Sequence, residues 1–280
     1  MPLSIPLLFF CGEILKFPEQ PDIRLAVYER EDNRAPVYFL APHQNERVIN
    51  RYLRKKVKRE GGKFLVIRQS GRRHLFLKFD EGVFEVDPNR IFTPRGARAS
   101  LLLENPDLDA ESELFQRVHL RAIGVGLFII QQMGGLAPGS TVVAIHNNTD
   151  GYDDDGQGGK GTISIHRYQK LMERGAAFIK DMHLGRGDED DLFFITSPDD
   201  FAAMKAAGWH VILQHPQVAD LEDEDDGSLS VLAEKRGLRY INIEAQRKWF
   251  ANHRRVQRRM TDFVFERVMP SAETPEKQNP

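Results

Sequence analysis

The chain has 280 residues, of which 41% are hydrophobic and 29% charged, proportions that are ordinary for a soluble globular protein. Its 39 basic and 41 acidic residues nearly cancel, so the overall charge gives no indication of a nucleic-acid or membrane-surface partner. The single cysteine, Cys11, excludes an internal disulfide framework and a metal site made of cysteines alone.

The first residues, PLSIPLLFFCGEIL, are apolar but do not form a convincing signal peptide. They lack a basic leading region and a clear small-residue cleavage site, and Glu13 interrupts them. No stretch of the sequence reaches the roughly 18 to 20 apolar residues of a membrane-spanning helix. The sequence therefore favours a soluble protein; it leaves the oligomeric state open, and the compartment too, with the cytoplasm favoured.

Strand-like and helix-like segments alternate along the first half of the chain. Runs rich in Val, Ile, Tyr and Phe predict strands at residues 23–28, 37–41, 64–68, 74–79 and 83–86. Helical spacing of apolar residues predicts helices at 45–60 and 110–133, each followed by a pair of glycines that ends it.

The alternation continues in the second half. Strands are predicted at 141–145, 192–196, 210–213 and 239–243, and helices at 198–207, 229–236 and 246–267. A glycine- and aspartate-rich loop at 150–161 and an acidic loop at 220–227 separate some of them. Without a break in composition, the pattern favours one mixed α/β domain over residues 1–268, followed by a tail of disordered composition at 269–280.

Residue types that bind metals follow two of the predicted strands directly. His43 and Glu46 come after the strand at 37–41, at a strand-to-helix turn where both side chains can face one point, and His146 follows the buried run TVVAI. Open α/β sheets bind ligands at the carboxyl ends of their strands, and catalytic zinc takes three His or carboxylate ligands. The pattern predicts a zinc site made by these three residues; a surface His-x-x-Glu pair and a core histidine are the alternatives.

Glu244 closes the run YINI, and a carboxylate at the end of a buried strand is costly unless it has a partner. Hydrolysis at a zinc site needs a base that takes a proton from water and passes it to the leaving amine. We therefore expect Glu244 to be this general base. The alternative is a glutamate that stabilises the start of the helix at 246–267 through the helix dipole.

Asn89 and Arg90, in DPNRIF, indicate a different chemistry. Arginine binds carboxylates through two parallel hydrogen bonds, and asparagine can donate beside it, so the pair predicts a site for a substrate with a free carboxylate. Asp-Pro-Asn is also favourable turn chemistry, which would make Arg90 an ordinary surface residue. Arg72 and Arg73, in SGRRHLF, are further candidates for polarising the scissile carbonyl.

In chain order these motifs resemble those of the zinc carboxypeptidase superfamily, which includes carboxypeptidase A and the aspartoacylase/succinylglutamate desuccinylase branch. The second branch is closer: HQNE is similar to its His-Gly-Asn-Glu, DPNRIF to its Asp-x-Asn-Arg-x-Phe, and IHNNT to its Leu-His-Asn-Thr-Thr. NIEAQ is similar, more loosely, to its closing Ile-Glu-Val-Gly. The resemblance implies an α/β fold with a mixed, mostly parallel sheet and helices on both faces.

The resemblance also implies roles for single residues. It makes His43, Glu46 and His146 the zinc ligands and Glu244 the general base, with Asn89 and Arg90 on the substrate carboxylate. It favours Arg73 over Arg72 as the residue that polarises the carbonyl. The implied activity is zinc-dependent cleavage of an amide bond in a small peptide or an N-acyl amino acid with a free carboxylate, as in a metallocarboxypeptidase.

Two other functions fit the same motifs. An N-acyl amino acid deacylase shares the metal chemistry and differs in the shape of its pocket. A binding module that kept the fold and lost turnover is a further alternative, against which the retention of Glu244 and of all three ligand types argues. Gln44 stands where the family commonly has glycine and is expected to narrow the approach to the metal, and the loops at 150–161 and 220–227 are candidates for lids.

Overall fold

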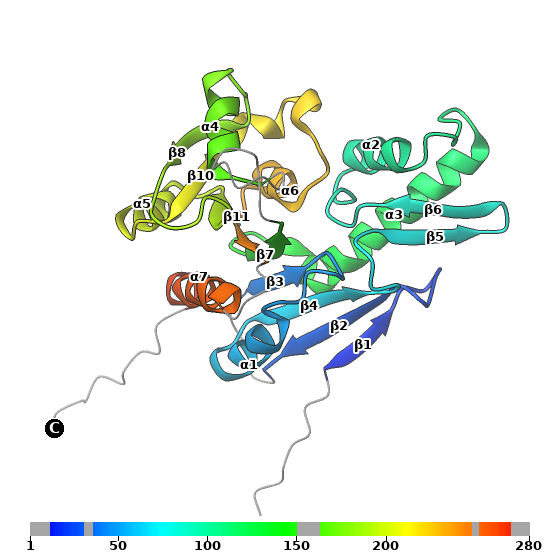
Figure 1. Cartoon of the computed structure of the whole chain (residues 1–280). Coiled ribbons are helices and arrows are strands. Elements are labelled where there is room, and N and C mark those ends of the chain that lie inside the picture. The colour runs from blue at the N-terminus through cyan, green and yellow to red at the C-terminus, as the bar shows by residue number, and fades with distance from the viewer. Residues whose placement is uncertain (1–11, 31–35, 150–162, 248–251, 270–280) are drawn as a thin grey trace, which may run out of the picture.

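The computed structural model describes residues 12–30, 36–149, 163–247 and 252–269, and a nine-stranded sheet organises them (Figure 1). The strand order is β1-β2-β4-β3-β7-β11-β9-β10-β8. These strands are β1 (Glu13–Lys16), β2 (Arg24–Glu29), β3 (Val37–Ala41), β4 (Lys63–Arg68), β7 (Thr141–Asn148), β8 (Ile179–His183), β9 (Leu192–Ile195), β10 (His210–Gln214) and β11 (Arg239–Gln246). The central strands β4, β3, β7 and β11 run parallel, while β9 and β10 form a parallel pair of the opposite direction. The predicted mixed, mostly parallel sheet is confirmed.

Helices cover both faces of this sheet. On one face, α1 (Asn50–Glu60), α5 (Pro198–Ala206) and α7 (Asn252–Val268) bury apolar residues against the strands. On the other face lie α3 (Glu113–Gln132) and α6 (Leu229–Arg236), and α4 (Ile165–Glu173) packs over β8, β9 and β10. Figure 1 shows α1 and α7 close to each other, and a hydrogen bond between Tyr52 and Asp262 joins them. The predicted helices on both faces are confirmed as well.

A small hairpin and one further helix complete the second face. The hairpin of β5 (Leu75–Phe79) and β6 (Gly82–Val86) and the helix α2 (Pro94–Glu104) share a hydrophobic core with α3. The sequence did not predict α2, because its buried side is made largely of the small residues Gly96, Ala97 and Ser100. Its start is nevertheless marked: Thr93 accepts a hydrogen bond from the backbone N–H of Gly96, and Pro94 occupies the first turn.

The alternation of side chains along the central strands determines which residues reach the site. Val142 and Ala144 of β7 and Tyr240 of β11 pack on the face of α3 and α6. Because side chains two positions apart share a face, His146 and Glu244 lie on that same face. The carboxyl ends of β3, β7 and β11 lie side by side, since β7 pairs with both of the others.

Several boundaries differ from the sequence prediction. Helix α1 begins at Asn50 rather than at residue 45, because residues 43–49 form turns at the site. Strands β7 and β11 each extend to the third residue past their predicted ends, so His146 and Glu244 lie within strands. The loop predicted at 150–161 and most of the predicted tail lie outside the described residues. In the part of the chain that is described, no helix is both long and apolar enough to cross a membrane.

Candidate active site

The loop between β3 and α1 carries His43 and Glu46, both buried. Its turn is closed by the backbone N–H of Glu46, which donates to the carbonyl oxygen of His43 at 3.2 Å. The side-chain oxygen of the intervening Gln44 accepts hydrogen bonds from the backbone N–H groups of Gln69 and Gly71. Gln44 therefore fastens this loop to the connection between β4 and β5. A cavity of about 750 Å³ lies beside the loop, and Gln44 is not among the described residues that line it.

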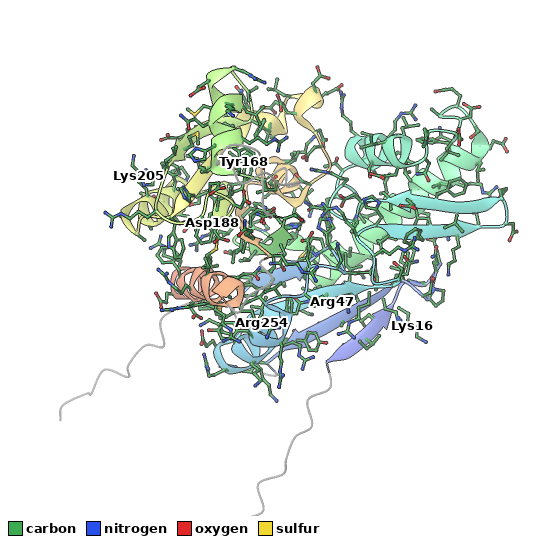
Figure 2. All side chains as sticks on the ribbon, in the orientation of Figure 1. Lys16, Arg47, Tyr168, Asp188, Lys205 and Arg254 are labelled. Atoms are coloured by element: carbon green, nitrogen blue, oxygen red, sulfur yellow. The ribbon has the colours of Figure 1, made fainter. Side chains whose placement is uncertain are left out.

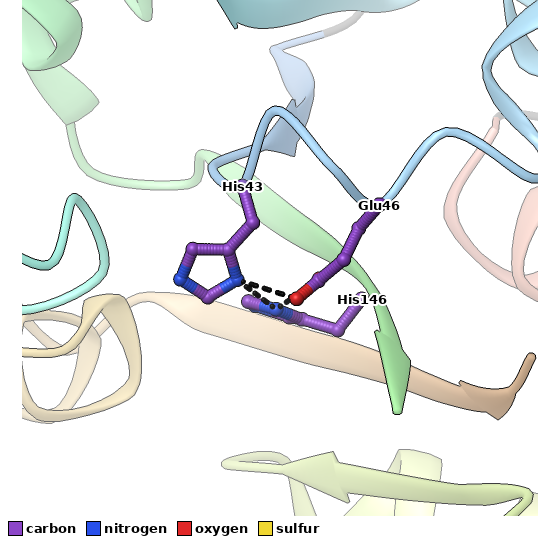
Figure 3. Close-up of side chains that lie close together, drawn as sticks. All are labelled: His43, Glu46 and His146. Carbon is purple, nitrogen blue, oxygen red and sulfur yellow. Dashed lines mark hydrogen bonds and ion pairs between the residues drawn. The ribbon is translucent and has the colours of Figure 1, made fainter. Parts of the chain in front are cut away.

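His146 and Glu244 are neighbours on adjacent strands. In the parallel pairing of β7 with β11, Glu244 lies opposite His146 in register. Figure 3 shows His43 and Glu46 reaching in from the loop after β3, and His146 meeting them from β7. Residues from three segments that are far apart in sequence therefore meet at one edge of the sheet.

The side chains of His43, Glu46 and His146 converge on one point. His43 Nδ1 lies 2.9 Å from Glu46 Oε1, His146 Nδ1 lies 3.1 Å from Glu46 Oε2, and the two Nδ1 atoms are 3.2 Å apart. Their candidate ligand atoms all lie within 4.8 Å of one another. Two imidazole nitrogens and a carboxylate form a donor set that zinc takes in catalytic sites, so the chemistry of these residues fits a zinc ion.

Asp87 belongs to this cluster, although the DPNR motif predicted a role in the site only for Asn89 and Arg90. Its Oδ1 lies 2.9 Å from His43 Nε2 and also accepts a hydrogen bond from the backbone N–H of Asn89. The backbone N–H of Asp87 donates to Ser100 Oγ at 3.1 Å, which ties the residue to α2. Histidines that bind metals commonly donate their second ring N–H to a carboxylate, and here that contact leaves Nδ1 directed at Glu46. The signal was present in DPNR, whose aspartate also fits an ordinary turn.

Electrostatics keep the carboxylates of this cluster ionised. Burial works to raise the pKa of Glu46, but hydrogen bonds to His146 and His43 outweigh it and hold that pKa far below its usual range. Burial is likewise outweighed at Asp87, whose contact with His43 holds its pKa far below the usual range. Burial tends to lower the pKa of His43, yet its hydrogen bonds to Asp87 and Glu46 raise it. The site therefore concentrates negative charge beside two imidazoles, which favours a bound cation.

Arg73, rather than Arg72, is directed into the cluster. Its Nη1 lies 2.8 Å from Glu46 Oε1 and its Nη2 lies 3.3 Å from Asp87 Oδ2. The guanidinium of Arg72 instead lies over the ring of Phe76, 5.5 Å from its centroid. Of the two, Arg73 is the one that lines the cavity.

Glu244 is buried beside the cluster and has a different electrostatic environment. Its Oε1 accepts a hydrogen bond from Asn242 Nδ2 at 3.1 Å. Burial raises the pKa of Glu244 above its ordinary value; His146 opposes this effect and Glu46 adds to it. The alternative role at a helix start is not observed, because Glu244 lies inside β11 and the described part of α7 begins at Asn252.

Asn89 and Arg90 lie in the loop between β6 and α2, and both line the same cavity. The segment is also a turn, in which the backbone N–H of Arg90 donates to the carbonyl oxygen of Asp87 at 2.9 Å. Within the described residues, Asn89 Oδ1 is buried without a hydrogen-bond partner. Arg90 Nη1 forms an ion pair with Asp226 Oδ2. The DPNR segment therefore forms a turn and also places Asn89 and Arg90 in the wall of the cavity.

The cavity that joins these residues has a volume of about 750 Å³. One end of it is lined by the cluster of His43, Glu46 and His146, and its other side by Asn89 and Arg90 with residues of the acidic loop. Between α4 and the strands β8 to β10 its wall is apolar, and Tyr168 on α4, labelled in Figure 2, is one of the residues that line it. The apolar wall consists of Ile163, Tyr168, Leu171, Phe178, Phe194 and Val218.

No protein-family model and no curated protein matches the chain. Among solved structures, the tripeptide-bound cell shape determinant Csd4 from Helicobacter pylori is 12% identical, with a TM-score of 0.44 over 89% of this chain and 56% of that one. This chain therefore spans little more than half the length of that protein.

Two further structures match at similar levels. An N-formylglutamate amidohydrolase from Ralstonia eutropha JMP134 is 15% identical, with a TM-score of 0.37 over 87% of this chain and 97% of that one. A succinylglutamate desuccinylase from Chromobacterium violaceum is 11% identical, with a TM-score of 0.44 over 93% of this chain and 70% of that one. Each of these three structures is 15% identical to the chain or less.

Proposed function

We propose that the protein is a zinc-dependent hydrolase that cleaves an amide bond in a small peptide or an N-acyl amino acid with a free carboxylate. The observation that carries this proposal is the meeting of His43, Glu46 and His146 in one buried cluster beside Glu244. Glu46 and His146 are 100 residues apart in sequence, so an accidental surface pair does not account for the contact. Buried charged groups pair with one another or coordinate metals, and groups with strongly shifted pKa values cluster at functional sites.

The proposed ligand atoms are Nδ1 of His43, Nδ1 of His146 and the carboxylate of Glu46. Zinc bound there would supply a Lewis acid for the scissile carbonyl and lower the pKa of a water molecule. Asp87 would keep His43 in the tautomer that has its lone pair on Nδ1, by accepting the proton on Nε2.

Glu244 would act as the base. Its carboxylate takes a proton from the attacking water and then gives it to the nitrogen of the leaving amine, so the C–N bond breaks as acid and amine form. Burial of Glu244 works to raise its pKa, the direction that strengthens a carboxylate as a base. Arg73 has a half-exposed side chain that can turn from Glu46 toward the carbonyl oxygen and donate to it as negative charge develops.

Asn89 and Arg90 would hold the free carboxylate of the substrate, and the apolar wall would receive a side chain or an acyl chain. A guanidinium beside an amide donor suits a planar carboxylate. The volume of the cavity suits a substrate of a few residues or an N-acyl amino acid.

Metal analysis with a substrate screen tests the proposal. We expect about one zinc per chain in the purified protein, and we expect His146→Ala to lose most of it while remaining folded. The matched control is His119→Ala, a histidine on α3 outside the cavity, which should keep its metal. Full occupancy in His146→Ala would contradict the ligand assignment.

The screen uses dipeptides and N-acyl amino acids, each as the free acid and as the amide of the same carboxylate. We expect hydrolysis of at least one free acid and much slower hydrolysis of its amidated partner. Bound zinc with no hydrolysis of any compound would instead favour a binding module.

A further inference from the structure

Arg90 already has a carboxylate partner inside the protein. Its Nη1 forms an ion pair with Asp226 Oδ2, and both residues line the active-site cavity. The other oxygen of Asp226 accepts a hydrogen bond from the backbone N–H of Ser228 at 2.9 Å, which holds the carboxylate in place. We propose that Asp226 is a specificity-determining residue, an internal carboxylate that occupies Arg90 until the carboxylate of a substrate replaces it. The inference rests on the proposed function, in which Arg90 binds that group.

The backbone of the acidic loop is pressed against the segment that carries Arg90. The backbone N–H of Phe92 donates to the carbonyl oxygen of Gly227 at 3.0 Å. Gly227 has φ +77°, and a Cβ atom added to it would lie 2.1 Å from the carbonyl oxygen of Arg90. A Cβ on Gly96 would lie 2.0 Å from Gly227 Cα. These approaches place Asp226 within reach of Arg90 independently of the ion pair.

Other contacts fasten the same loop without Asp226. Arg95 donates to Glu222 at 2.8 Å and to Asp223 at 2.7 Å. The buried carboxylate of Asp225 accepts from Thr93 Oγ1 at 2.6 Å and pairs with a lysine of α6. The loop is therefore held by at least three neighbours of Asp226, and the contact between Asp226 and Arg90 is not needed to keep it in place.

The carboxylate of a substrate can replace Asp226 in the ion pair with Arg90. The side chains of Arg90 and Asp226 are 39% and 50% exposed, and pairs exposed to this extent stabilise a structure only weakly. The incoming carboxylate gains the guanidinium and the neighbouring Asn89, whereas the released Asp226 is hydrated by solvent. Because Asp226 and an external carboxylate compete for Arg90, the apparent affinity equals the intrinsic affinity multiplied by the fraction of molecules in which Arg90 is free. Asp226 thereby excludes ligands that bind Arg90 weakly.

The test measures binding of 3-phenylpropanoate, a carboxylate with an apolar tail, and of the neutral 3-phenylpropanamide, by calorimetry on the purified protein. Asp226→Asn keeps an oxygen for the N–H of Ser228 and removes the charge that faces Arg90. We expect it to bind the acid about fivefold more tightly and the amide as the wild type does. The matched control is Asp223→Asn, which removes the same charge from the same loop but faces Arg95; it should change acid binding less than about twofold.

The same substitution made in protein that also carries Arg90→Ala distinguishes a failure of this inference from a failure of the proposed function. Asp226→Asn should have no effect on acid binding when Arg90 is replaced by Ala, because the two residues act through one contact. Unchanged or weaker acid binding in the single variant Asp226→Asn would overturn the inference, the weaker case showing that Asp226 positions Arg90 instead. If Arg90→Ala alone leaves acid binding intact, the carboxylate site of the proposed function is wrong.

Discussion

The two ends of the cavity are built in different ways. At the end proposed to bind the metal, His43, Glu46 and His146 are each 5% exposed or less, and their side chains lie within hydrogen-bonding distance of one another. At the carboxylate end, Arg90 meets Asp226 in a single ion pair that is open to solvent. Buried polar networks are rigid because each lost contact is costly, whereas exposed ion pairs exchange partners easily. The comparison indicates that the groups proposed for the chemistry are fixed by the fold, while the group proposed for recognition is adjustable.

The largest expected effect tests the rigid end. Glu244→Gln should lower kcat by about 10²-fold or more, the scale of a missing general base, and should leave the zinc content unchanged. Kinetics on the best free-acid substrate and metal analysis of the same sample measure both quantities. The control is Glu224→Gln, another acidic residue that lines the cavity, for which we expect nearly normal kcat. Loss of metal in Glu244→Gln would make Glu244 a ligand, and normal activity would assign the proton transfer to another group.

The next effect concerns the residue that supports His43, one of the proposed metal ligands. Asp87→Asn should weaken zinc binding by about 10- to 100-fold, because an amide holds the tautomer of His43 less firmly than a carboxylate does. Competition with a chelator of known affinity measures the change. Asp80→Asn, on the exposed turn of the β5–β6 hairpin, is the matched control and should bind zinc as the wild type does. Equal affinities in the two variants would show that Asp87 serves only the turn.

A smaller effect is expected at the adjustable end. Arg90→Ala should lower kcat/KM on a free acid by about tenfold and barely affect the amidated analogue, since one charge-assisted contact is lost at a site partly open to water. Arg95→Ala removes an arginine that also binds the acidic loop but does not line the described cavity, and it should leave both rates nearly unchanged. Equal rates on acid and amide in the wild type would mean that DPNR provides only a turn.

The smallest expected effect is on the stability of the fold, and it involves Glu234, a residue that does not line the cavity. Burial raises the pKa of Glu234, on α6, from 4.5 to about 7. Below pH 4.5 the folded and unfolded states both bind the proton; between pH 4.5 and 7 the unfolded state releases it first, so stability falls as the pH rises. Glu234→Gln removes this loss of stability, so we expect the variant to be more stable than the wild type at pH 8. The expected difference is about 1 kcal/mol, because solvent screens the charge of a half-buried group. Urea unfolding at pH 4.5 and pH 8 checks it; the same difference at both pH values would contradict the assignment to Glu234.

The sequence by itself determined the strongly patterned elements and the residue types of the site. The uncharged β-branched run of β7 and the spaced apolar residues of α3 specify a strand and a helix locally, because burial requires those periods. The motifs likewise named His43, Glu46, His146 and Glu244, which the structure brings to one edge of the sheet. Their roles in zinc binding and catalysis stay predictions, as does the single domain at 1–268.

Elements that bury little were missed. Strand β1 lies at one edge of the sheet and β8 at the other, and both are largely exposed, so neither has a clear apolar alternation. In α4 only Ile165 is fully buried. A local pattern identifies an element through its buried face, and these elements have too small a face to show one.

Only the tertiary structure decided which groups contact one another. The family resemblance favoured Arg73 over its neighbour Arg72, but only the packing of the loop before β5 shows that Arg73 alone of the two contacts Glu46. Arg90 and Asp226 are 136 residues apart, and no local pattern relates them. Their contact follows from the close approach of two backbones at Gly227, a long-range packing event. Periodicity fixes the direction of a side chain within its own element, whereas the partner it meets depends on how separate elements pack.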